Sequence, residues 1–191
     1  MSDIKKTGHG RWGSLVETAI EGQNLNGEDQ LFILMQAAQY LTATRGLGAP
    51  EARICCERAE ALGHSINRPL LLYSALIGQW RYTLITEKLA AAMPIAERVY
   101  SLAQEQNDPT LMIWAYNALS ATLYFLGDFE TSRQHAMSGV RIWHSGNVQS
   151  HPEDYYTPAV GCLCYGALSE WHLGEIASCQ ANIADAISLA K

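Results

Sequence analysis

Five cysteines are the residues whose spacing first suggests chemistry in this chain. Cys162 and Cys164 are two residues apart, Cys55 and Cys56 are adjacent, and Cys179 stands alone. Thiolates bind zinc when they converge in pairs. Residues two apart on a helix point to different sides, however, and no second cysteine or histidine pair has zinc spacing. We therefore predict reduced thiols that pack between helices, with no metal and no cofactor.

Histidines and acidic side chains suggest two further kinds of chemistry. His151, Glu153 and Asp154 share one long loop, 146–157, and could hold a cation weakly, although a solvated acidic loop is the simpler interpretation. Nucleophilic catalysis needs a serine or cysteine activated by a histidine, and these groups can lie far apart in the sequence. The sequence contains no nucleophile elbow and no G-x-x-x-x-G-K-[ST] loop. We predict no catalytic residue and no enzymatic activity in this chain.

Four side chains are candidates for contacting a ligand or partner: Arg81, Trp114, Asn117 and Tyr124. In a stack of helical hairpins they fall on the concave side, on the first helix of two successive hairpins. An arginine beside an asparagine can clamp a peptide carboxylate or backbone, and the aromatic rings can anchor the peptide. In the alternative interpretation, segment 109–126 is buried because it is apolar nearly all round, and Trp114 and Tyr124 are core residues.

The elements that must position these side chains repeat along the chain. NRPLLL at 67–72 returns 40 residues later as NDPTLM at 107–112, and Ala96 is matched at the same spacing by Ala136. Self-similarity at a period of roughly 20 to 50 residues is typical of solenoids, whose units bury their apolar faces by stacking on neighbours. The sequence therefore predicts an all-α helical-repeat solenoid.

Apolar residues at helical spacing predict eight helices that pair into about four antiparallel hairpins. We interpret residues 1–12 as a linker or a leftover of cloning, residues 13–22 as one more helix, and 13–191 as the repeat domain. The paired helices are expected at 28–44 with 50–62, 69–85 with 88–106, 109–126 with 129–145, and 158–173 with 176–190.

Capping residues set several of these borders. Asp108 and Thr157 precede prolines and offer an N-cap oxygen. Gly127 and Gly174 fall where a left-handed C-cap residue is needed.

Two positions are less straightforward. Gly63 is expected to end the helix that begins at Pro50. Pro94 lies inside the expected helix 88–106, where it removes a backbone donor and should kink the helix, unless the helix begins near Met93.

Composition argues against several classes of function. The 191 residues are 48% hydrophobic and 17% charged, as in a well-packed domain. The net charge of −6 counts against nucleic acid or anionic membrane as a partner, since both require a basic surface. Because there is no signal peptide and no bilayer-spanning apolar stretch, we predict a cytoplasmic protein. Segment 176–190 reaches the last residue without a C-cap, so we expect a fragment of a longer protein, whose uncapped repeat ends would favour a homo-oligomer.

The repeat resembles a known family at two levels. Around Gly127, the pattern of Leu119, Leu123, Phe129 and Ala136 resembles a degenerate tetratricopeptide repeat. A narrower resemblance is to the tetratricopeptide tail of large bacterial signalling proteins, which join a class III adenylate or guanylate cyclase domain, or another effector, to a predicted AAA-like ATPase. The segments that carry it are LTATRG (41–46), APE (49–51), WRY (80–82), LGDF (126–129) and PAVGCL (158–163).

This resemblance implies a regulatory rather than a catalytic role. The tail in that family is not an enzyme and is thought to bind a partner or sense a signal, and the cyclase and ATPase parts have no counterpart in these residues. We therefore expect a non-catalytic protein or peptide interaction and regulatory module from a larger bacterial signalling ATPase or cyclase. The alternative is a sensor domain that binds a small molecule or peptide in the concave groove.

Overall fold

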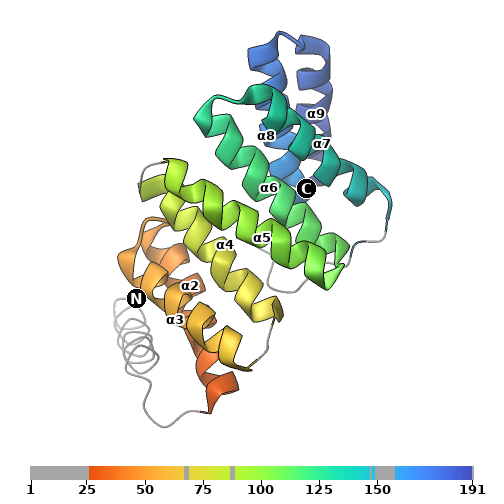
Figure 1. The fold of residues 1–191 in the computed structure, drawn as a ribbon. Helices are drawn as coiled ribbons and strands as arrows, with labels where there is room; N and C mark the ends of the chain where they lie inside the picture. Colours follow the sequence, from red (N-terminus) through yellow and green to blue (C-terminus); the bar gives the residue numbers. More distant parts are fainter. Residues whose placement is uncertain (1–25, 67–68, 87–88, 147, 149–157, 191) are drawn as a thin grey trace, which may run out of the picture. The chain divides into compact units, whose positions relative to one another are not determined.

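The first helices that the structure describes form an antiparallel pair with a third helix packed on it. A computed structural model describes residues 26–66, 69–86, 89–146, 148 and 158–190. Contacts between Cα atoms divide the chain into two compact units, Met1–Thr86 and Glu87–Lys191. The first unit contains α2 (Gly27–Arg45), α3 (Pro50–Ile66) and α4 (Pro69–Thr86), which lie side by side in Figure 1.

The first unit is held by small and aliphatic side chains between α2, α3 and α4. Leu31, Leu34 and Ala59 are fully or almost fully buried in its core. Where α3 meets α4, a Cβ built on Gly78 would overlap the sulfur of Cys56, so the glycine admits the buried thiol. The predicted packing role of cysteine is thus observed at this crossing.

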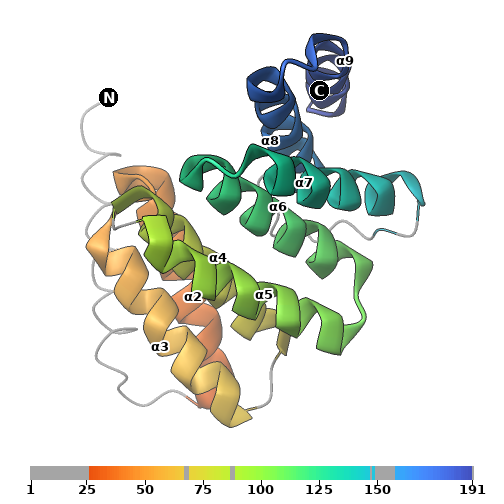
Figure 2. The same ribbon diagram turned by 45° about the horizontal axis from the view of Figure 1, so that its top comes forward.

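The second unit stacks two hairpins. Its elements are η1 (Leu89–Ala91), α5 (Ala92–Gln106), α6 (Pro109–Leu126), α7 (Phe129–His144), α8 (Pro158–Leu173) and α9 (Ile176–Leu189). Helices α6 and α7 form one pair and α8 and α9 the next, and α8 packs against both α6 and α7 (Figure 2). This layering confirms the predicted all-α helical-repeat fold, and the residues described here contain no strand.

Three of the four expected hairpins lie within a unit: α2 with α3, α6 with α7, and α8 with α9. The remaining one, α4 with α5, has one helix in each unit and stays a prediction. The expected linker at 1–12, the helix at 13–22, the Thr157 cap and the loop carrying His151, Glu153 and Asp154 lie outside the described residues. None of the helices in the described ranges is long and apolar enough to cross a membrane.

The predicted caps act as local chemistry requires. The Asp108 carboxylate accepts hydrogen bonds from the amides of Thr110 and Leu111, at 2.7 and 3.3 Å, and so satisfies two free donors at the start of α6. Gly127 and Gly174 have φ values of 86° and 81°, the left-handed conformation that ends α6 and α8.

Two predicted borders are wrong. The helix that begins at Pro50 does not stop at Gly63 but continues to Ile66, because Gly63 is a buried helical residue in contact with Leu72 and does not adopt the left-handed conformation of a C-cap. Helix α5 does not begin near Lys88; it begins at Ala92, after the short turn η1, which confirms the alternative of a start near Met93. Pro94 thus sits in the first helical turn, where the missing N–H has no intrahelical partner to lose.

Candidate functional site

The structure places three of the four predicted binding residues on one helix. Trp114, Asn117 and Tyr124 lie on α6 in the second unit, and Arg81 lies on α4 in the first. Trp114 is 6% exposed and Asn117 1%, whereas Tyr124 is half-buried. A clamp between Arg81 and Asn117 would join the two units and stays a prediction. Of the three predicted binding residues in the second unit, Tyr124 is the one whose side chain is partly accessible to a ligand.

Asn117 faces α8 rather than solvent. A Cβ built on Gly161 would overlap the Asn117 carboxamide, so the two helices approach there as closely as glycine permits. The Oδ1 atom of Asn117 has no hydrogen-bond partner among the described residues. Leaving such an oxygen buried and unpaired costs about 1–3 kcal/mol. A ligand could contact Asn117 only if α8 moved away from α6.

A chain of buried hydroxyl groups ties α6, α7 and α8 together. The Ser169 hydroxyl donates to Ser132 Oγ at 2.9 Å, and the Ser132 hydroxyl donates to the Ser120 carbonyl oxygen at 2.8 Å. All three serines are fully buried. The Ser120 hydroxyl donates to the Asn117 carbonyl oxygen at 3.1 Å, so each buried hydroxyl is satisfied, and the bonds between helices fix the relative height of the three helices. The ends of these helices are then held in register, one turn beyond the serines.

Five rings meet at those helix ends and form what we call the aromatic cluster: Tyr124, Phe125, Phe129, Tyr165 and His172. Phe129 stacks on His172, with ring centroids 4.1 Å apart and an interplanar angle of 5°. Tyr124 lies at the centre of the cluster, with its ring centroid 5.4–5.9 Å from those of the other four. Its hydroxyl is 3.4 Å from Nε2 of His172. Offset and stacked rings at such distances attract each other by about 0.5–1.5 kcal/mol per pair.

The aromatic cluster is firmly held on one side and open on the other. Phe125 is 47% exposed and His172 is also exposed, while Tyr124, Phe129 and Tyr165 are half-buried. Ring edges and faces that remain accessible on a fixed backbone can take up an apolar side chain by contact or a cationic one through the π system. The cluster can therefore bind a side chain without rearranging.

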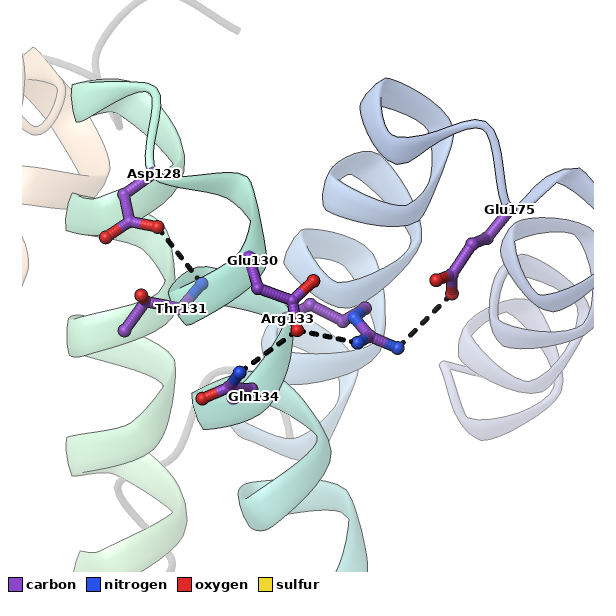
Figure 3. A network of polar contacts seen from close by, with 6 residues as sticks. All are labelled: Asp128, Glu130, Thr131, Arg133, Gln134 and Glu175. Atoms are coloured by element: carbon purple, nitrogen blue, oxygen red, sulfur yellow. Dashed lines mark hydrogen bonds and ion pairs between the residues drawn. The ribbon is translucent and has the colours of Figure 1, made fainter.

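A polar network beside the aromatic cluster links the starts of α7 and α9 (Figure 3). Arg133 donates from its two terminal nitrogens to Glu130 at 2.8 Å and to Glu175 at 3.2 Å, and Gln134 donates to Glu130 at 3.0 Å. The hydrogen bond from Arg133 holds the pKa of Glu130 below its usual value, so this carboxylate stays ionised. Arg133 thus links two helices. Its side chain is partly exposed, but its Nε atom is buried and has no hydrogen-bond partner in the part of the chain that is described.

Negative charge predominates at this end of the second unit. Asp128 caps α7 through the Thr131 amide at 3.1 Å, and Glu130 and Glu175 share the single guanidinium of Arg133 (Figure 3). Nearby Glu170 is 3% exposed and accepts from Asn182 Nδ2 at 2.8 Å. Burial raises the pKa of Glu170, and the hydrogen bond from Asn182 offsets part of that rise. The field around the rings therefore favours a cationic neighbour.

The buried cysteines pack rather than react. Cys55, Cys56, Cys162 and Cys179 are buried and Cys164 is exposed, all as free thiols. Burial raises the pKa of Cys55 to about 11 and that of Cys56 to about 12, and it raises the pKa of Cys162 as well. These thiols stay protonated at neutral pH and are weak nucleophiles. In the described ranges, no three histidine, cysteine or acidic residues converge as a metal site would require.

Sequence reasoning found Tyr124 but did not single out its partners Tyr165 and His172. These residues lie 41 and 48 positions beyond Tyr124, so their meeting depends on how the two hairpins stack. Alignment of the two hairpins on their C-cap glycines, Gly127 and Gly174, could have predicted part of this meeting. Phe125 and His172 each stand two residues before such a glycine and so occupy the same position of the repeat. Residues at one register position of successive hairpins lie close together in a solenoid.

Comparison with known proteins adds no relative: no protein-family model matches this chain, and no curated protein matches it.

Proposed function

We propose that this chain is a non-catalytic interaction and regulatory module that binds a protein or peptide segment through the aromatic cluster. One observation carries the proposal: five rings from three helices meet at a rigid edge, and Phe125 remains 47% exposed there. Rigid aromatic side chains supply large contact areas at low entropic cost, and for this reason they dominate binding energies at protein interfaces.

The charges around the rings define the kind of peptide. Asp128, Glu130 and Glu175 contribute three carboxylates, and Arg133 compensates only one. A peptide with an apolar or aromatic anchor followed by lysine or arginine complements both features. An acidic peptide would be repelled, as would nucleic acid by the net charge of −6.

The wider role rests on the resemblance to the tetratricopeptide tails of bacterial signalling ATPases and cyclases. In that setting, binding at the aromatic cluster would report a partner to catalytic domains elsewhere in a longer protein. Five free thiols, four of them buried, agree with a reducing cytoplasm. The proposed module needs no cofactor.

The test is a selection of peptides on the immobilised chain from a random twelve-residue display library. Peptides that share an apolar anchor and a basic residue are expected, and Phe125→Ala should weaken their binding at least about tenfold, a loss of about 1.4 kcal/mol. Fluorescence polarisation of labelled peptides measures the change. Phe125 is half-exposed, so its removal should leave the circular dichroism spectrum and the melting temperature almost unaltered.

Phe32→Ala is the matched control, because Phe32 is 55% exposed on α2 of the first unit. It removes the same ring from a comparable surface and should not alter peptide binding. Equal affinity of the selected peptides for wild type and Phe125→Ala would refute the proposed site. Enrichment of acidic peptides would refute the proposed ligand chemistry.

A further inference from the structure

Helices α8 and α9 expose a second surface, which adjoins the aromatic cluster on α8. Its large apolar members are Leu168 (42% exposed) and Trp171 (61%) on α8, with Ile176 (42%), Ile183 (44%) and Ile187 (55%) on α9. We call these five residues, together with the exposed Cys164, the α8–α9 face. Soluble proteins rarely expose large contiguous groups of apolar side chains, and such groups mark interaction surfaces.

The spacing on each helix is that of a packing seam. On α9, Ile176, Gln180, Ile183 and Ile187 follow intervals of four, three and four residues, and all four are exposed. This is the a/d spacing with which one helix packs along another. The buried residues of α9 that face α8, Cys179 and Ala186, lie on a neighbouring side of the helix. The seam is therefore additional to the hairpin contact.

Helix α8 also has exposed residues at intervals of three and four. Cys164, Leu168 and Trp171 stand at intervals of four and three residues, and all are exposed. The two seams thus run along two helices that pack against each other. A partner helix laid between them would contact both at once.

The repeat itself shows how such a face is covered. Going back 47 residues, the distance from Gly174 to Gly127, places Leu168 at Ala121, Ile183 at Ala136 and Ile187 at Val140. Those three earlier residues are buried, at 0%, 0% and 7% exposed. Within the second unit α8 packs on both α6 and α7, the two helices that carry them. The α8–α9 face continues this interface, one hairpin further along.

Where α8 covers α6 and α7, small residues let the helices approach closely. Gly166 of α8 lies against Ala136, where an added Cβ would be 3.4 Å from the alanine methyl, and Gly161 lies against Asn117. At the later register positions the residues are larger: isoleucine replaces Ala136 and leucine replaces Ala121. A partner must therefore bring side chains that interdigitate with bulky ones, as a copy of the same seam does.

Charge favours the same occupant. The seam on α9 contains no ionised residue, and Asp185 lies on the opposite side of the helix. Two copies with a net charge of −6 each can meet at this face without bringing carboxylates together.

We propose that a second copy of this chain covers the α8–α9 face, so that two copies form a two-fold symmetric dimer through their α9 seams and the flanking α8 residues. In a two-fold interface the same patch serves both partners. With the helices antiparallel and the axis near residues 181–182, Ile176 meets Ile187 of the other copy, and Gln180 meets Ile183. Trp171 then packs at the edge of the seam and provides the largest buried area.

The dimer should be reversible. Five large apolar side chains are fewer than the roughly 20–30 residues that a standard interface contributes per partner, so we expect a dissociation constant on the order of 10 µM. Light scattering after size exclusion, from about 1 to 500 µM protein, should show the mass rising towards twice the 21.0 kDa of the chain.

Ile183→Glu tests the seam directly, because two-fold symmetry places two new carboxylates in the interface. We expect the dissociation constant to rise at least about a hundredfold. Ala181→Glu is the matched control: it adds the same charge at an exposed position on the far side of α9 and should leave the dimer intact. Both substitutions are on the surface, so circular dichroism should show folded protein in each case.

Cys164 supplies a second readout on α8. It is the exposed thiol among five free cysteines, so its reaction with a maleimide can be followed separately from the buried ones. Labelling should be slower in the dimeric wild type at high concentration than in Ile183→Glu. A chain that stays monomeric at about 500 µM would overturn the proposal, as would a dimer that survives Ile183→Glu. Neither result bears on peptide binding at Phe125, so this proposal and the proposed function fail independently.

Discussion

Gly139 on α7 allows a close approach between the two hairpins of the second unit. A Cβ built on it would lie 2.6 Å from the Sγ atom of Cys162 on α8 and 3.2 Å from the Cβ atom of Tyr116 on α6. Cys162 is completely buried, and its thiol donates to the Ile113 carbonyl oxygen at 3.6 Å. The sulfur thus has little room to retreat. Gly139→Ala should therefore destabilise the unit although alanine is the better helix former.

Two opposing effects set the size of the change. Replacing glycine by alanine inside a helix gains about 1 kcal/mol, and overpacking a core costs about 1–3 kcal/mol. We expect a net loss of about 1 kcal/mol in the free energy of unfolding for Gly139→Ala. In a Cys162→Ala background the obstructing sulfur is absent, so the same substitution should become stabilising by up to about 1 kcal/mol. The coupling between the two sites is then about 2 kcal/mol.

Urea denaturation of wild type, both single variants and the double variant measures this coupling. Circular dichroism and tryptophan fluorescence should be followed together, so that separate unfolding of the two units is detected. A parallel cycle with Gly78→Ala and Cys56→Ala probes a similar contact in the first unit, where the same reversal of sign is expected. If the effects of the glycine and cysteine substitutions on the free energy of unfolding add to within about 0.5 kcal/mol, the two sites are independent. The claim that the glycine makes room for the sulfur would then be wrong.

Two titratable groups in the second unit predict opposite pH dependences of the melting temperature, measurable by scanning fluorimetry. Burial raises the pKa of Glu170, so stability falls as the pH rises from the ordinary carboxyl pKa through the raised one. Glu170→Gln, which can still accept from Asn182, should therefore melt at a higher temperature near pH 7, with a flatter profile; a lower melting temperature would contradict this account. Burial lowers the pKa of His135, so its contribution is fully present above the ordinary histidine pKa and is lost as the pH falls below it. His135→Phe should remove that loss, and an unchanged acid slope would exclude His135 as its source.

Helix borders were predictable where the deciding chemistry is local. The structure ends α6 and α8 at Leu126 and Leu173, as expected, because Gly127 and Gly174 supply the left-handed residue within the chain itself. Gly63 was misassigned for the converse reason. Gly63 is buried against Leu72, a neighbour brought close only by tertiary packing, and a buried glycine inside a helix looks the same in sequence as one that ends a helix.

The candidate site was predictable in part. The hairpin register placed Tyr124 among the binding positions, and the structure shows its ring at the centre of the aromatic cluster. The stacking of Phe129 on His172 joins residues 43 apart and depends on the angle between hairpins, which no local pattern encodes. The 47-residue interval that aligns Gly127 with Gly174 also exceeds the 40-residue period, so the strict repeat does not superpose these rings.

A comparison of the two glycine contacts explains why the repeat is faint in the sequence. In the first unit the thiol stands on α3 (Cys56) and the glycine on α4 (Gly78), whereas in the second unit the glycine stands on α7 (Gly139) and the thiol on α8 (Cys162). Both crossings join the second helix of one hairpin to the first helix of the next. Each contact pairs a glycine with a thiol, but the two contacts do not occupy equivalent positions of the repeat, because two steps of the 40-residue period carry Cys56 to Ala136 and not to Gly139. Close packing constrains the sum of two facing side chains and leaves their order free. A search for sequence periodicity compares single positions. It therefore does not detect a repeat in which packing constrains the combined volume of two side chains on different helices, although the repeated fold is kept.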